Sequence, residues 1–125
     1  MSPEQQPTPA EWKILRIVSE HGPCAAREVV AVAEQAHGWS TSTIKTLLRR
    51  LVDKRHLKTK QVGNSFLYRV SRSASRSLRE AADQLLDHAA SGTVAPLLAY
   101  LVKKSKLSEE ELQELRDLID DKEAE

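Results

Sequence analysis

The chain has 125 residues, of which 40% are hydrophobic and 30% charged, with four glycines and five prolines. This length is enough for one ordinary core or for a small head with a helical tail, and the composition is that of a folded, helix-rich protein. No apolar run approaches the roughly 20 residues of a membrane span, and the first residues lack the features of a secretory signal. We therefore expect a cytoplasmic protein with no membrane partner.

Charge is distributed unevenly, although the net charge is only +1. Residues 40–72 contain nine Lys and Arg residues and a single acid, Asp53, whereas residues 107–125 contain two basic and nine acidic residues. A local excess of positive charge that is not interrupted by acids is typical of a surface that contacts phosphate groups.

The N-terminal part predicts two helices. Thr8 to Glu11 supplies an N-cap, a proline at the first helical position and a capping box, so a helix is expected over about 8–21. It should end at His21-Gly22-Pro23. A second helix is expected over about 25–37, with its stop at His37-Gly38.

The segment that begins at Ser40 is the clearest element. Ser40 is expected to cap a helix whose apolar residues recur at i, i+3, i+4, i+7 and i+8, namely Ile44, Leu47, Leu48, Leu51 and Val52. Its opposite side carries small hydroxyl side chains near the start and long cations further on. Such a side suits a helix that enters the major groove of DNA.

The period then changes from helix to strand. Residues 57–62 alternate, Gly63-Asn64-Ser65 is a turn, and residues 66–70 are rich in strand-forming side chains, so a hairpin is predicted. Three helices followed by a hairpin are the order of a winged helix-turn-helix domain, which we assign to residues 1–70.

Residues 71–125 return to a helical pattern. Helices are expected over about 71–90, after Thr93 as an N-cap, and after Ser108, which forms a capping box with Glu111. Three short amphipathic helices cannot bury their apolar faces against one another, so we expect this domain to form a homodimer. The predicted dimerisation residues are Leu78, Leu85, Leu86, Val94, Leu97, Leu98, Leu101, Val102, Leu112 and Leu115. The fold class is therefore mainly α with a small β-hairpin wing.

Three stretches resemble the penicillinase-repressor family (BlaI, MecI and a copper-responsive branch). Residues 10–14 resemble the family's opening A-E-W-x-[VI], and residues 39–51 are similar to its recognition helix, W-S-x-x-T-[IV]-K-T-L-L-x-R-L. Residues 107–112 resemble the L-S-x-E-E-[LI] of its last helix. The resemblance covers about 8–120 and implies a homodimeric repressor that binds a palindromic operator in double-stranded DNA through its winged helix.

The resemblance also concerns the inducing signal. In one branch a membrane-sensor and protease pathway triggers cleavage in the dimer region, but Tyr100-Leu101 replaces the Asn-Phe pair of that branch. The cysteine cluster of the copper-responsive branch is missing as well. The sequence therefore leaves the inducing signal, the operator sequence and the regulated genes open.

Candidate DNA-contacting residues lie on the helix that begins at Ser40 and on the wing. We predict direct readout by Ser42, Thr43 and Thr46, with Lys45 and Arg49 reaching guanine or phosphate, and Lys58, Lys60 and Asn64 on the DNA backbone. By resemblance, Thr43, Lys45 and Thr46 face the groove and Arg50 is the family's conserved arginine. The full predicted set is Ser40, Thr41, Ser42, Thr43, Lys45, Thr46, Arg49, Arg50, Lys58, Lys60 and Asn64.

The end of the recognition helix departs from the family. Arg55 replaces the glycine with which the family usually ends this helix, so a left-handed cap there should be strained or restructured.

Other features indicate what the protein is not expected to be. The four histidines lack metal-ligand spacing and no catalytic set of residues is visible, so no enzyme, cofactor or metal is expected. Cys24 fits a buried apolar position, with a redox sensor as the alternative. A winged-helix module that binds proteins is the alternative function, and the retained basic side argues against it.

Overall fold

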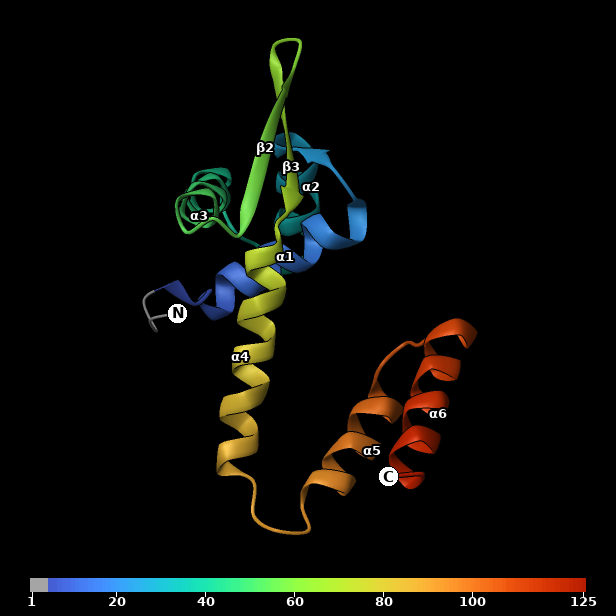
Figure 1. Cartoon of the computed structure of the whole chain (residues 1–125). Coiled ribbons are helices and arrows are strands. Elements are labelled where there is room, and N and C mark those ends of the chain that lie inside the picture. The colour runs from blue at the N-terminus through green and yellow to red at the C-terminus, as the bar shows by residue number, and fades with distance from the viewer. Residues whose placement is uncertain (1–4) are drawn as a thin grey trace. The chain divides into compact units, whose positions relative to one another are not determined.

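The computed structural model describes residues 5–125. The chain divides into two compact units, Met1–Asp83 and Gln84–Glu125. Figure 1 labels the elements, which are α1 (Pro9–His21), β1 (Cys24–Ala25), α2 (Ala26–His37), α3 (Thr41–Asp53), β2 (Leu57–Val62), β3 (Ser65–Val70), α4 (Arg72–His88), α5 (Val94–Lys104) and α6 (Glu109–Glu123). The predicted class, mainly α with a small hairpin wing, is confirmed.

Local capping fixes where the first and third helices begin. Thr8 Oγ1 accepts a hydrogen bond from the Glu11 amide at 3.2 Å, and Glu11 Oε1 accepts one from the Thr8 amide at 2.8 Å. At α3, Ser40 Oγ accepts a hydrogen bond from the Thr43 amide at 3.2 Å. Both predicted N-caps are confirmed, and each satisfies amides that would otherwise lack partners.

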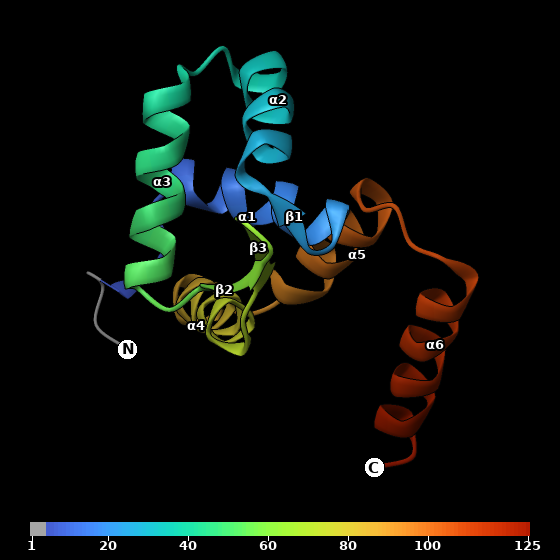
Figure 2. The same cartoon turned by 90° about the horizontal axis from the view of Figure 1, so that it is seen from above.

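The core of the first unit lies among α1, α2 and α3, which Figure 2 shows with α2 and α3 joined by a short loop and α1 alongside both. The predicted apolar side of α3 is confirmed, because Ile44, Leu48 and Leu51 are at most 1% exposed. Each such side chain contributes roughly 1.5–3 kcal/mol through burial. The opposite side of α3 is thereby held toward solvent.

A three-stranded antiparallel sheet completes this unit, with strand order β1-β3-β2. The hairpin of β2 and β3 turns at Gly63 and Asn64, as predicted, and its register pairs Lys58 with Arg69. Strand β1 is a correction to the sequence analysis, which placed no strand there. Its two residues, Cys24 and Ala25, pair with Tyr68 and Leu67 of β3.

The end of α3 keeps a left-handed residue although it is not a glycine. Arg55 has φ +68°. The Arg55 amide donates to the Val52 carbonyl at 2.9 Å, and the His56 amide donates to the Leu51 carbonyl at 2.8 Å. These two bonds form a Schellman motif, which satisfies two carbonyls at the helix end. Of the two expected outcomes, the cap is strained rather than restructured.

The second unit has no core of its own. Within residues 84–125, all of which the structure describes, no side chain is buried. The predicted capping box of α6 is confirmed, because Ser108 and Glu111 exchange hydrogen bonds of 3.0 and 3.1 Å. The predicted cap of α5 is wrong in its chemistry: Thr93 is the N-cap residue, but its hydroxyl donates to the Ala90 carbonyl and not to the helix.

Candidate nucleic-acid interface

The outer side of α3 is the first half of the candidate interface. Ser40, Thr41, Ser42, Thr43, Lys45, Arg49 and Arg50 are exposed, and Thr46 is half-buried. Within the described part of the chain, no hydrogen bond or ion pair occupies the side chains of Ser42, Lys45, Arg49 or Arg50. These donors are therefore available to another molecule.

The hydroxyl side chains of α3 differ in how far hydrogen bonds within the protein occupy them. Ser40 Oγ donates to Thr43 Oγ1 at 3.0 Å, and Thr41 Oγ1 donates to Glu34 Oε1 of α2 at 2.8 Å. The first bond orders the turn itself, and the second positions the start of α3 relative to α2. Further along, Thr46 Oγ1 donates to the Ser42 carbonyl at 2.9 Å, which leaves the lone pairs of Thr46 free to accept.

The wing carries the second half of the candidate interface. Because paired residues of an antiparallel hairpin share a side, and alternate residues do too, the register puts Lys58, Lys60 and Arg69 on one side. All three are exposed, as is Asn64 in the turn. Arg69 is not among the site residues predicted from the sequence. The turn at Gly63-Asn64 could have located it, since the turn fixes the register of the hairpin.

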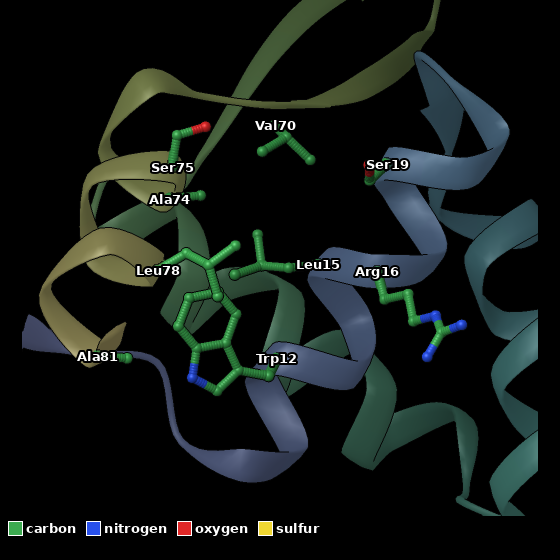
Figure 3. Close-up of a pocket in the computed structure, with 9 residues that line it drawn as sticks. All are labelled: Trp12, Leu15, Arg16, Ser19, Val70, Ala74, Ser75, Leu78 and Ala81. Atoms are coloured by element: carbon green, nitrogen blue, oxygen red, sulfur yellow. The ribbon is translucent and has the colours of Figure 1, made fainter. Parts of the chain in front are cut away.

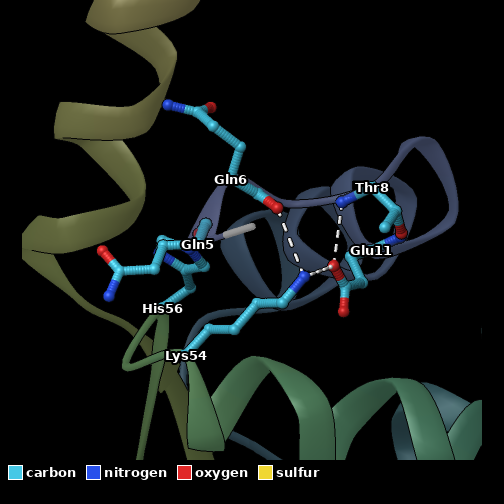
Figure 4. Close-up of polar contacts among 6 residues, drawn as sticks. All are labelled: Gln5, Gln6, Thr8, Glu11, Lys54 and His56. Atoms are coloured by element: carbon cyan, nitrogen blue, oxygen red, sulfur yellow. Dashed lines mark hydrogen bonds and ion pairs between the residues drawn. The ribbon is translucent and has the colours of Figure 1, made fainter. Parts of the chain in front are cut away.

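Lys54 lies in the basic stretch of residues 40–72, but its charge does not belong to the basic surface predicted there. Figure 4 shows its side chain directed into the protein, where Nζ lies 2.6 Å from Glu11 Oε1 and 3.2 Å from the Gln6 carbonyl oxygen. Burial raises the pKa of the Glu11 carboxyl, but the hydrogen bonds from Lys54 and Thr8 outweigh it and lower the pKa below its ordinary value. Lys54 therefore neutralises a buried carboxylate and is not available to phosphate.

His56 follows Arg55 and connects the end of α3 to two other segments. It is fully buried. Because a carbonyl oxygen only accepts, Nε2 donates to the Gln5 carbonyl, while Nδ1 lies 3.1 Å from Ser73 Oγ at the start of α4. The loop after α3 is thus fixed from both sides.

An apolar groove lies between α1 and the first half of α4 (Figure 3). Its volume is about 510 Å³, and Trp12, Leu15 and Leu78 are its largest apolar lining side chains. Leu78, a predicted dimerisation residue, is 61% exposed. The groove offers apolar surface that the described residues leave uncovered.

Among residues 5–125, no group of three His, Cys, Asp or Glu side chains could hold a metal ion, and no helix has the length and apolar character of a membrane span. Cys24 is buried, and burial together with the charge of Glu28 raises the pKa of its thiol. A raised pKa disfavours the thiolate that redox chemistry needs.

Comparisons with known proteins agree with this arrangement. The family model described as "Penicillinase repressor" matches residues 7–121. The penicillinase repressor of Bacillus licheniformis is 25% identical over 112 residues, covering 90% of this chain and 88% of that protein. An uncharacterized 16.5 kDa protein from the ptsI 3' region of Latilactobacillus sakei is 32% identical over 112 residues, covering 90% of this chain and 77% of that protein.

A solved structure resembles part of the chain. The solution structure of the DNA-binding domain of the repressor BlaI is 28% identical, with a TM-score of 0.51. The match covers 57% of this chain and 87% of that domain.

Proposed function

The chain belongs to the penicillinase repressor family of DNA-binding transcriptional repressors, and we propose that it acts as a homodimer on a palindromic operator in double-stranded DNA. The observation that carries the proposal is the outer side of α3, which presents free cations and hydroxyls beside a basic wing. The relatives it matches are bacterial proteins, and bacterial DNA lies in the cytoplasm, so we infer that the protein acts there.

Recognition would come from α3 in the major groove. Ser42, Thr43 and Thr46 lie in its first half, where a recognition helix approaches base edges. Lys45 and Arg49 follow on the same outer side and reach guanine or phosphate. Ser40 and Thr41 act by positioning the helix start, and Arg50 contacts the flanking phosphates.

The wing would hold the neighbouring backbone. Lys58 and Lys60 share its basic side, and Asn64 lies at its turn. Contacts of this kind set orientation and affinity rather than sequence preference. Because they release counterions, they make binding weaken steeply as the salt concentration rises.

Dimerisation would supply the core that the C-terminal helices lack. Ten of the twelve large hydrophobic side chains that are exposed in the described residues lie between Leu78 and Ile119. An apolar surface of this extent is unusual on a monomer, and a two-fold dimer is the commonest way to cover it. The proposed interface comprises Leu78, Leu85, Leu86, Val94, Leu97, Leu98, Leu101, Val102, Leu112 and Leu115.

A DNA titration tests the proposal. The full chain should bind random DNA at low salt, and it should bind operators recovered by in vitro selection more tightly. Lys45→Ala and Arg49→Ala should each weaken operator binding about tenfold or more, since hydrogen bonds of charged groups contribute about 1.5–3 kcal/mol. Arg79→Ala removes an exposed cation of α4 as a matched control.

Two results would refute the assignment. If neither variant changes operator affinity or its salt dependence relative to Arg79→Ala, α3 is not the reading helix. If the chain does not retain random DNA on a filter even at low salt, a module that binds protein partners becomes the better interpretation.

A further inference from the structure

A second cavity lies at the base of the wing, where α3 ends and α4 begins. It has a volume of about 530 Å³. Besides Val70, the side chains around it are four cations and two hydroxyls: Arg55, Lys58, Arg69, Arg72, Ser71 and Ser73. No carboxylate lines it. Apart from Lys58, none of these residues belongs to the predicted DNA-contacting set.

The four cations have no counter-charge among the residues that the structure describes. Within residues 5–125, none of them takes part in an ion pair or a side-chain hydrogen bond. Lys58 and Arg69 face each other directly across the hairpin, an arrangement of like charges that destabilises a sheet. An anion between them would convert this repulsion into attraction.

Hydrogen bonds that do not involve the charged side chains hold the cavity in shape. Ser71 Oγ donates to the Arg55 carbonyl, and the Ser71 amide donates to the His56 carbonyl at 3.0 Å. Arg72 and Ser73 are the first residues of α4, whose first amides have no acceptor within the helix. The helix end adds a favourable dipole to the four cations.

Arg55 lines the cavity from a strained backbone conformation. Its φ of +68° is one that favours glycine. An arginine is present in spite of that strain, and its side chain is one of the four around the cavity.

We propose that this cavity binds a phosphate group. Three arginines offer paired N–H donors that match the oxygens of a phosphate, and four positive charges suit its charge better than that of a single carboxylate. The phosphate can come from the DNA backbone beside α3 or from a small phosphorylated molecule. The cavity is argued from its own residues, and only the DNA source depends on the proposed function.

Titration with inorganic phosphate tests the cavity itself. The full ¹⁵N-labelled chain is titrated with sodium phosphate at constant ionic strength, balanced with sodium chloride, while the amides of Ser71–Ser73 and the arginine Nε–H signals are followed. We expect saturable shifts at these signals. Arg69→Gln should weaken binding about tenfold or more, whereas Arg79→Gln, on exposed α4 surface outside the cavity, should not.

The salt dependence of DNA binding identifies the source. A lost backbone contact lowers the slope of log K against log salt by about 0.9. Saturable phosphate binding together with a slope that is lowered in Arg69→Gln but not in Arg79→Gln supports a DNA phosphate. Saturable phosphate binding that Arg69→Gln weakens, with an unchanged slope or with no DNA binding at all, supports a small phosphorylated ligand. Non-saturating shifts that are equal in all three proteins would overturn the proposal.

Discussion

Replacing Arg55 by glycine isolates the strain at the end of α3. Arg55 occupies the left-handed region at φ +68°, while its amide and that of His56 complete the Schellman motif. Glycine can adopt the same conformation and make the same two backbone hydrogen bonds. Because the Arg55 side chain is exposed and unpaired among the described residues, its loss removes little else.

The expected gain follows from two opposing contributions. A residue with a Cβ costs roughly 1–2 kcal/mol in the left-handed region. Glycine in turn loses about 0.4–1 kcal/mol more conformational entropy on folding. Arg55→Gly should therefore raise the free energy of unfolding by about 0.5–1 kcal/mol, which corresponds to a few degrees in Tm.

Two control variants separate the backbone from the side chain. Arg55→Ala removes the charge but retains the Cβ, so it should not show the gain. Gly38→Ala is the inverse change: Gly38 also has φ +68°, and an added Cβ would meet no atom within 4 Å. Its cost, about 0.5–1 kcal/mol by the same two contributions, therefore measures the backbone contribution alone.

Denaturant unfolding of the full chain gives the free energies, at one fixed protein concentration because dimerisation would couple to stability. An Arg55→Gly protein that is no more stable than Arg55→Ala would refute the strain argument. The comparison with Arg55→Ala also excludes relief of repulsion among the wing-base cations as the cause, since both variants remove the same charge.

Two further measurements test the buried ion pair and the C-terminal helices. Since the folded-state pKa of Glu11 is lowered, its contribution to stability is present at neutral pH and is lost as pH falls through that pKa. Glu11→Gln should lower the free energy of unfolding by about 1–3 kcal/mol near neutral pH, and its stability should converge with that of the parent in acid. As a control, Glu20→Gln, in the exposed pair with Arg16, should lower it by less than about 0.5 kcal/mol. Parallel pH profiles of stability for Glu11→Gln and the parent would contradict this. Leu98→Asp, at a side chain that is 56% exposed, should sediment as a monomer. As a control, Lys106→Asp, between α5 and α6, should remain dimeric. A Leu98→Asp dimer of unchanged affinity would show that Leu98 does not belong to the interface.

Much of the fold could be predicted because its signals are local. The capping boxes at Thr8 and Ser108 lie within four residues of chain, and the apolar side of α3 repeats with the helical period. The switch to alternation after Leu57 located the wing. The outer side of α3, and with it the candidate interface, followed from the same helical period.

Other features depend on partners that are distant in sequence. Strand β1 has only two residues and no periodicity, and it exists because β3 lies beside it. Lys54 resembles its basic neighbours in the sequence, yet Glu11, 43 residues earlier, takes it out of the basic surface.

The sequence by itself therefore determined the helices, the wing and the side of α3 that faces outward, since helical period, alternation and capping act over a few residues. Tertiary structure alone decided which charged side chains are paired within the protein and which unpaired ones lie close together. It brought Arg55, Lys58, Arg69 and Arg72 around one cavity from a helix end, two strands and a helix start. Long-range electrostatics depends on distance in space, and a linear sequence does not contain that distance.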